Sequence, residues 1–171
     1  MEAKEALKIL RAQYHDFLNC LQVVSGLVDL GRPEKIKEYV RRAADEFAAR
    51  GRLAKSGLPE VTWLLLRFQT EAAEHGIKVS CELGQGTGES VPEAAFLGRF
   101  HEAIVARSSG VREERLLKIT GKRTPKGYAL TYSGPFAWKE VAGAVAETAA
   151  AAGVKLTVAE ENAATILLPV R

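Results

Sequence analysis

The spacing of apolar residues in the first thirty positions restricts most strongly how this chain can fold. The intervals alternate between three and four residues, which is the pattern of a helix packed in the manner of a coiled coil. The residues that follow this pattern are Leu7, Leu10, Tyr14, Phe17, Leu21, Val24 and Val28. A long amphipathic helix is therefore predicted here.

A second helix is predicted directly after a tight turn. Gly31 suits the C-terminal cap of the first helix, and Pro33 suits the first turn of the next one. The apolar pattern then continues through Ile36, Val40, Ala43 and Phe47, and it fades between residues 51 and 57. We therefore predict a helical hairpin as the first domain, residues 1–57.

The apolar arc of the first helix is wider than one neighbouring helix would cover. At 100° per residue, the main row is extended sideways by Ile9, Cys20, Val23 and Leu27. Two hairpins from two chains would bury this surface in a four-helix bundle. We therefore expect a homodimer.

The pattern changes after residue 57. A helix is expected from Pro59 until Gly76 stops it, and further helices over residues 92–106 and 137–152. Strands are expected over residues 77–83, 115–121, 128–133, 154–158 and 165–170. This order predicts an α+β fold for the second domain, residues 58–171, with a sheet that carries its helices on one face.

Charge and composition exclude several classes of protein. Residues 1–57 hold 11 Lys/Arg against 8 Asp/Glu, whereas residues 58–171 hold 13 of each, and a net charge of +3 is too small to indicate nucleic-acid binding. Neither the scattered histidines nor Cys20 and Cys81 have metal-ligand spacing. The sequence shows neither an apolar run of the roughly 18 residues that a membrane span needs nor the pattern of a secretion signal. We expect a cytoplasmic protein without a membrane or nucleic-acid partner and without a metal of its own.

His15 lies on the polar side of the first helix, roughly 130° from the apolar row. The same stripe holds Lys8, Arg11, Asn19 and Gln22. An exposed imidazole is largely uncharged near neutral pH and can act as a nucleophile toward a phosphoryl group. Arg11 and Lys8 would offer positive charge to that group and Asn19 a hydrogen bond, while Asp16 could orient the ring or accept a proton.

A solvated histidine is the simpler interpretation of His15, because most histidines on wet helix faces carry no chemistry. The other histidines have structural interpretations: His75 as a favourable residue at a helix C-terminus, and His101 as a structural or surface residue. Cys20 is interpreted as a small core residue. From the residue types alone, both interpretations of His15 stay open.

The segment LRAQYHDFLNCLQVVSGLVDLGR, residues 10–32, resembles the phosphoacceptor helix of the sporulation-initiation phosphotransferase B family and of the related citrate and malate sensor histidine kinases. In that pattern a histidine is followed by an acid, an aromatic or apolar pair, an asparagine and then a pair such as Leu-Gln. The resemblance implies that His15 is the phosphorylated residue, with Asp16 as the acid beside it and Asn19 as the amide one turn later. Cys20 departs from the pattern, because relatives commonly have lysine there, and this departure affects charge or partner affinity at that edge.

The resemblance also implies a second domain similar to the ATP-binding domain of histidine kinases. Such a domain needs an asparagine that holds Mg²⁺, an aspartate in a D-x-G-x-G turn and a glycine-rich lid over the phosphates. Here residues 96–107 contain no asparagine, Gly134 and Pro135 lack a preceding aspartate, and residues 139–153 read KEVAGAVAETAAAAG in place of a lid. We expect a degenerate ATPase-like domain that has lost ATP binding, and no cofactor bound by this chain.

A glycine-rich segment, GQGTGES, offers a second phosphate-binding motif. Gly84 and Gly86 match the first two glycines of G-x-G-x-x-G, but the third position is Glu89, whose charge would repel a pyrophosphate. We interpret the segment as a flexible turn.

Together these features predict a histidine phosphotransferase of a phosphorelay, which by the resemblance acts in sporulation initiation. A phosphorylated response regulator would dock on the bundle, His15 would accept the phosphoryl group, and a second regulator would receive it, with Mg²⁺ held by the regulators. Lys8 and Gln22 are expected to contact these partners. Two alternatives remain: an ATP-dependent sensor histidine kinase core, and a non-catalytic helical scaffold or inhibitor that binds a kinase or a regulator.

Overall fold

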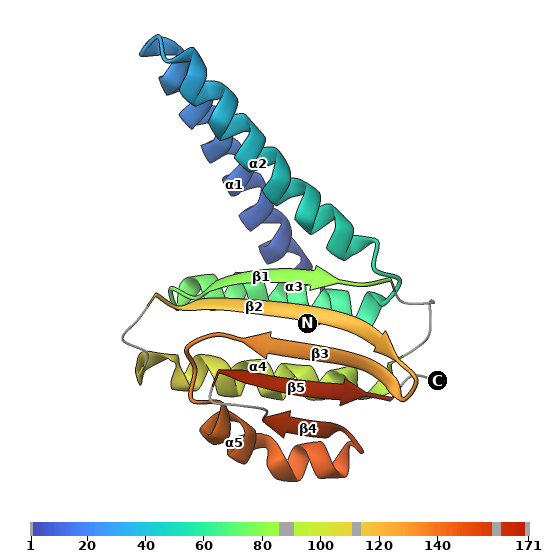
Figure 1. Ribbon diagram of the computed structural model, residues 1–171. Helices are drawn as coiled ribbons and strands as arrows, with labels where there is room; N and C mark the ends of the chain where they lie inside the picture. The colour runs from blue at the N-terminus through green and yellow to red at the C-terminus, as the bar shows by residue number, and fades with distance from the viewer. Residues whose placement is uncertain (1, 86–90, 111–113, 159–161, 170–171) are drawn as a thin grey trace. The chain divides into compact units, whose positions relative to one another are not determined.

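The computed structural model describes residues 2–85, 91–110, 114–158 and 162–169. Most of the glycine-rich segment, residues 86–90, lies outside these ranges, so its interpretation as a turn stays a prediction. The chain divides into two compact units, Met1–Gly51 and Arg52–Arg171 (Figure 1). This division falls a few residues before the boundary expected from the sequence.

The first unit is the predicted helical hairpin. It consists of α1 (Glu2–Asp29) and most of α2 (Pro33–Ala54), the pair of long helices in Figure 1. Gly31 takes a left-handed backbone conformation with φ of 59°. Its N–H donates to the carbonyl of Val28 at 2.9 Å, and the N–H of Arg32 donates to that of Leu27 at 3.1 Å. This turn satisfies carbonyls that the end of α1 would otherwise leave unpaired.

The apolar row predicted on α1 is largely exposed in the single chain. Leu7 is 51% exposed, Tyr14 69% and Leu21 49%. Within the described part of the chain, every large apolar side chain that is exposed lies on α1, on α2 or in the turn between them, except Leu116. The two helices of one hairpin therefore do not cover their own apolar surface.

The second unit is a five-stranded mixed sheet with helices. Its elements are α3 (Pro59–Glu74), β1 (Lys78–Leu83), α4 (Ala95–Arg107), β2 (Leu116–Thr124), β3 (Gly127–Ser133), α5 (Trp138–Ala151), β4 (Lys155–Val158) and β5 (Ala163–Leu168). The strand order is β1-β2-β3-β5-β4. β1 runs parallel to β2, and the other neighbours are antiparallel. The α+β fold predicted from the sequence is confirmed.

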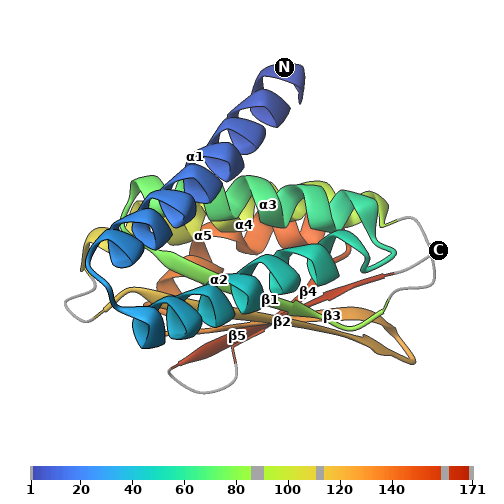
Figure 2. The ribbon, with the colours of Figure 1, turned by 90° about the horizontal axis from the view of Figure 1, so that it is seen from above.

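The helices α3, α4 and α5 cover one face of this sheet (Figure 2). Side chains on β2 alternate accordingly, with Leu117 and Ile119 buried and Lys118 exposed. The fully buried side chains Phe68 on α3, Phe100 on α4, and Trp138 on α5 belong to one apolar core. The opposite face of the sheet carries polar side chains, among them Lys118, Thr131 and Thr165.

The hairpin of β2 and β3 is longer than the sequence suggested. The two strands expected over residues 115–121 and 128–133 leave KRTPKG, residues 122–127, as their connection, but Lys122 pairs with Ala129, and β2 continues to Thr124. The hydroxyl of Thr124 donates to the carbonyl of Gly127 at 2.9 Å and accepts the N–H of Lys126 at 3.3 Å, which closes the turn. β5 also begins earlier than expected, at Ala163, while its expected end at residue 170 falls outside the described residues.

His101 belongs to the core of the second unit. Its ring stacks on Phe68 with centroids 4.0 Å apart, and its Nε2 lies 2.9 Å from the hydroxyl of Tyr132. Burial lowers the pKa of His101 to about 3, and the nearby charge of Arg67 adds to this shift. His101 is therefore a neutral structural residue.

Candidate functional site

His15 lies in the middle of α1 with its side chain exposed. Its Nδ1 is 3.1 Å from Nδ2 of Asn19, one helical turn later. In the part of the chain that the structure describes, Nε2 of His15 has no hydrogen-bond partner. The site therefore holds the imidazole through one nitrogen and leaves the other available to a ligand.

Asp16 faces α2. Its Oδ2 accepts a hydrogen bond from Nη1 of Arg50 at 2.9 Å, and both side chains remain about half exposed, at 46% and 40%. Beside this ion pair, the rings of Phe17 and Phe47 meet edge to face with centroids 6.2 Å apart. These two contacts join α1 to α2 next to His15, so the helix that carries the imidazole is fixed at that point.

The remaining predicted site residues lie along α1 with exposed side chains. These are Lys8, Arg11 and Gln22. Among the described residues, Arg11 and Gln22 form no hydrogen bond or ion pair. The structure thus brings Asn19 onto His15 and Asp16 onto Arg50, and it leaves Arg11 and Gln22 open to a partner.

Arg50 is the residue of this site that the sequence did not reveal. It lies 34 positions after Asp16, directly before the segment, residues 51–57, where the apolar pattern fades. Only the register between the two helices of the hairpin could have indicated it. A helical projection of α1 alone contains no information about that register.

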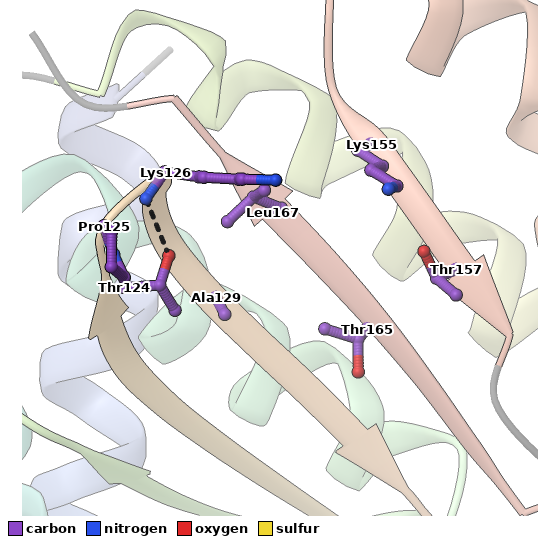
Figure 3. A pocket seen from close by; sticks show the side chains of 8 residues that line it. All are labelled: Thr124, Pro125, Lys126, Ala129, Lys155, Thr157, Thr165 and Leu167. Atoms are coloured by element: carbon purple, nitrogen blue, oxygen red, sulfur yellow. Dashed lines mark hydrogen bonds between the residues drawn. The ribbon is translucent and has the colours of Figure 1, made fainter.

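A hollow in the second unit is a further concave feature (Figure 3). It has a volume of about 320 Å³ and is lined by Thr124, Pro125, Lys126, Ala129, Lys155, Thr157, Thr165 and Leu167. Figure 3 shows Lys126 reaching from the β2–β3 turn toward β5. The lining contains no carboxylate, imidazole or thiol, so it has no imidazole or thiol nucleophile. Phosphoryl transfer through a histidine therefore cannot occur in this hollow.

The described ranges of the chain lack two further features. They contain no cluster of three or more His, Cys, Asp or Glu side chains that could hold a metal ion. They also contain no helix with the length and apolar character needed to cross a membrane.

Comparison with known proteins points to the same helices. Residues 1–56 match the family model described as the SpoOB-type sensor kinase alpha-helical domain. The match covers the hairpin, which is therefore similar to this family of domains. The matched residues include His15, Asp16, Asn19 and Arg50, and the likeness indicates a phosphotransfer domain of two-component signalling.

Two solved structures show a distant likeness to the whole chain. A bacterial phosphotransferase, solved at 1.7 Å, is 9% identical, with 97% of each chain covered and a TM-score of 0.42. The histidine kinase AdeS of Acinetobacter baumannii is 10% identical, with 92% of this chain and 98% of that chain covered and a TM-score of 0.42. No curated protein matches the sequence.

Proposed function

We propose that this protein is a histidine phosphotransferase of a phosphorelay, which moves a phosphoryl group between response-regulator aspartates through His15. The observation that carries the proposal is the exposed imidazole on a SpoOB-type helix, with Asn19 at its Nδ1 and no described partner at Nε2. An imidazole arranged in this way is accessible and oriented, which are the two properties that a phosphoryl acceptor requires.

The transfer step uses Nε2 as the nucleophile. Its lone pair forms the N–P bond while the P–O bond to the donor aspartate breaks, and the aspartate leaves as a carboxylate with the electron pair. Nε2 has this lone pair in the ring tautomer that carries its proton on Nδ1, and the proton stays there when the N–P bond forms. Rotation of the Asn19 amide presents its oxygen to that proton, because the two ends of an amide exchange donor and acceptor roles. Mg²⁺ would be held by the carboxylates of the regulator and would neutralise the phosphoryl oxygens.

The exposed apolar row supports a dimeric form of this enzyme. Tyr14, Leu21 and Val28 are between 49% and 69% exposed in one chain, and water contact of this extent is unfavourable for large side chains. A second hairpin packed on the row would bury them in a four-helix bundle. His15, on another side of α1, would remain at the surface of that bundle.

The charge of the hairpin suits response regulators as partners. Residues 1–57 carry 11 Lys/Arg against 8 Asp/Glu, and a regulator presents an acidic pocket that holds Mg²⁺. Attraction between such surfaces raises the rate of encounter. We expect the exposed side chains of Lys8, Arg11 and Gln22 to contact the docked regulator.

Transfer without ATP is supported by the second unit. α4 contains no asparagine that could hold Mg²⁺ near a triphosphate, and most of residues 139–153, where a kinase would have its lid, lies in the helix α5. A triphosphate without its metal ion carries an uncompensated charge. The phosphoryl group would then come from a regulator, and by the family resemblance the relay would serve sporulation initiation.

The decisive experiment follows label from a single-domain regulator that carries a labelled aspartyl phosphate. The wild-type protein should acquire a label that is stable in base and labile in acid, and His15→Gln should acquire none. His75→Gln, which changes another exposed histidine, is the matched control and should be labelled normally. Labelling of His15→Gln would refute the proposal.

Two further mixtures separate the alternatives. Incubation with labelled ATP and Mg²⁺ alone should leave the protein unlabelled, whereas a histidine kinase would become labelled. A scaffold would bind the regulator and remain unlabelled in every mixture.

A further inference from the structure

The carboxylate nearest in sequence to His15 is bound by α2. Asp16 follows His15 directly, yet its Oδ2 lies 2.9 Å from Nη1 of Arg50. The ion pair is about half exposed, so it is accessible to a docked protein and also to screening by salt. A neighbouring carboxylate could orient the imidazole ring through Nδ1. Here the amide nitrogen of Asn19 lies at that atom instead, 3.1 Å away.

Charge explains why such an arrangement matters for this reaction. A phosphoryl group arrives with negative oxygens, on a regulator whose pocket is itself acidic. An uncompensated carboxylate beside the nucleophile would repel both of them. A guanidinium paired with that carboxylate removes most of the repulsion while the acid stays in place.

We propose that Arg50 is a positioning residue of the phosphotransfer site, which holds the Asp16 carboxylate against α2 and neutralises it beside His15. The inference rests on the proposed function of His15. Arg50 touches no reacting atom in this scheme: the N–P bond forms at Nε2 of His15 and the P–O bond breaks on the regulator. Its effect on transfer acts through Asp16.

A double-mutant cycle tests this role. Arg50→Gln leaves the Asp16 charge uncompensated and should slow transfer from a phosphorylated regulator about tenfold at low salt, in the range of couplings between directly contacting charges. Asp16→Asn removes the charge that needs compensation and should slow transfer by about threefold at most. The double variant should therefore return to within about threefold of the wild-type rate, because the two effects are not additive.

Arg42→Gln is the matched control, since it removes the same charge from the same helix. The Arg42 guanidinium lies over the ring of Tyr39, 5.5 Å from its centroid, and the substitution should leave the rate within about twofold of wild type, as for surface substitutions away from a site. Circular dichroism at several temperatures should show equal helix stability for all variants. A structural loss alone would not be rescued by the second substitution.

Two results would overturn the inference. If the double variant is as slow as Arg50→Gln, Arg50 acts on the phosphoryl group or the regulator directly. If Arg50→Gln transfers at the wild-type rate, the ion pair has no part in transfer. Absence of label on the wild-type protein would instead remove the proposed function, and this inference with it.

Discussion

The side-chain amide of Asn19 lies 3.1 Å from Nδ1 of His15, one turn of α1 away. Both residues are on the same rigid helix, so the contact needs no change in backbone conformation. The amide can donate to an unprotonated Nδ1 or accept from a protonated one, so it can hold either tautomer of the ring.

Asn19→Ala should slow phosphoryl transfer about ten- to hundredfold, because loss of orientation at a reacting group costs rate in this range. Binding of the regulator and the helix content of the protein should change little. Single-turnover transfer at saturating regulator measures the rate. Ser25→Ala, at another exposed polar position of α1, is the control, and equal slowing of both variants would contradict a specific role for Asn19.

Arg11→Ala should weaken the encounter with the regulator rather than the chemical step. The side chain is exposed and has no described ion pair, so its charge is available to an acidic partner. The second-order rate constant for transfer should fall about threefold at low ionic strength, and the difference should vanish near 1 M salt, where the Debye length is only about 3 Å. Lys139→Ala, on α5, removes one exposed positive charge from the second unit and should have no such effect.

Leu21→Asp should convert the protein to monomers. Leu21 is 49% exposed in the single chain, and a charge at this position cannot be buried between two hairpins without a large desolvation cost. Sedimentation or light scattering at micromolar concentration measures the mass. Leu116 is the control, because it is similarly exposed, at 48%, but lies on β2 in the second unit. The Leu116→Asp variant should stay dimeric. A monomeric wild-type protein would remove the four-helix bundle from the scheme.

Acid should destabilise the second unit through His101. Its pKa in the folded protein is about 3 against an ordinary value of 6.5, so between these values the unfolded chain binds a proton that the folded chain does not. The contribution is complete above pH 6.5 and is lost as the pH falls toward 3.

The paired substitution His101→Phe and Tyr132→Phe removes the titrating ring together with its hydroxyl partner. Urea unfolding at several pH values measures the free energy of unfolding. As the pH is lowered, this free energy should fall less steeply in the variant than in the wild type, and the two slopes should differ by up to about 1.4 kcal/mol per pH unit. Parallel curves for the variant and the wild type would show that His101 does not titrate in this window.

The parts of this molecule that the sequence predicted are those governed by local periodicity. The helices α1 and α2 follow from the three-and-four spacing, and Asn19 was placed near His15 because residues four apart share a helix face. The length of the β2–β3 hairpin was underestimated because it depends on pairing between strands and not on local periodicity. Lys122 is polar and resembles a loop residue, but it is held in the sheet by its pairing with Ala129.

Arg50 shows the same limit at the site. Its contact with Asp16 depends on how far the turn at Gly31 shifts one helix along the other, and this shift is a tertiary property. His101 illustrates it in the core, because the residue type allowed either a surface or a structural position. Only the stacking on Phe68 and the hydroxyl of Tyr132 decided between them.

Both tryptophans of the chain, Trp63 on α3 and Trp138 on α5, belong to the second unit. Trp138 is 1% exposed and its indole N–H donates to the carbonyl of Gly134 at 3.0 Å, whereas the hairpin contains no tryptophan. Intrinsic fluorescence excited at the indole band therefore observes the sheet and its helices without a signal from the hairpin. An unchanged emission spectrum in a hairpin variant would show that the second unit has kept its packing.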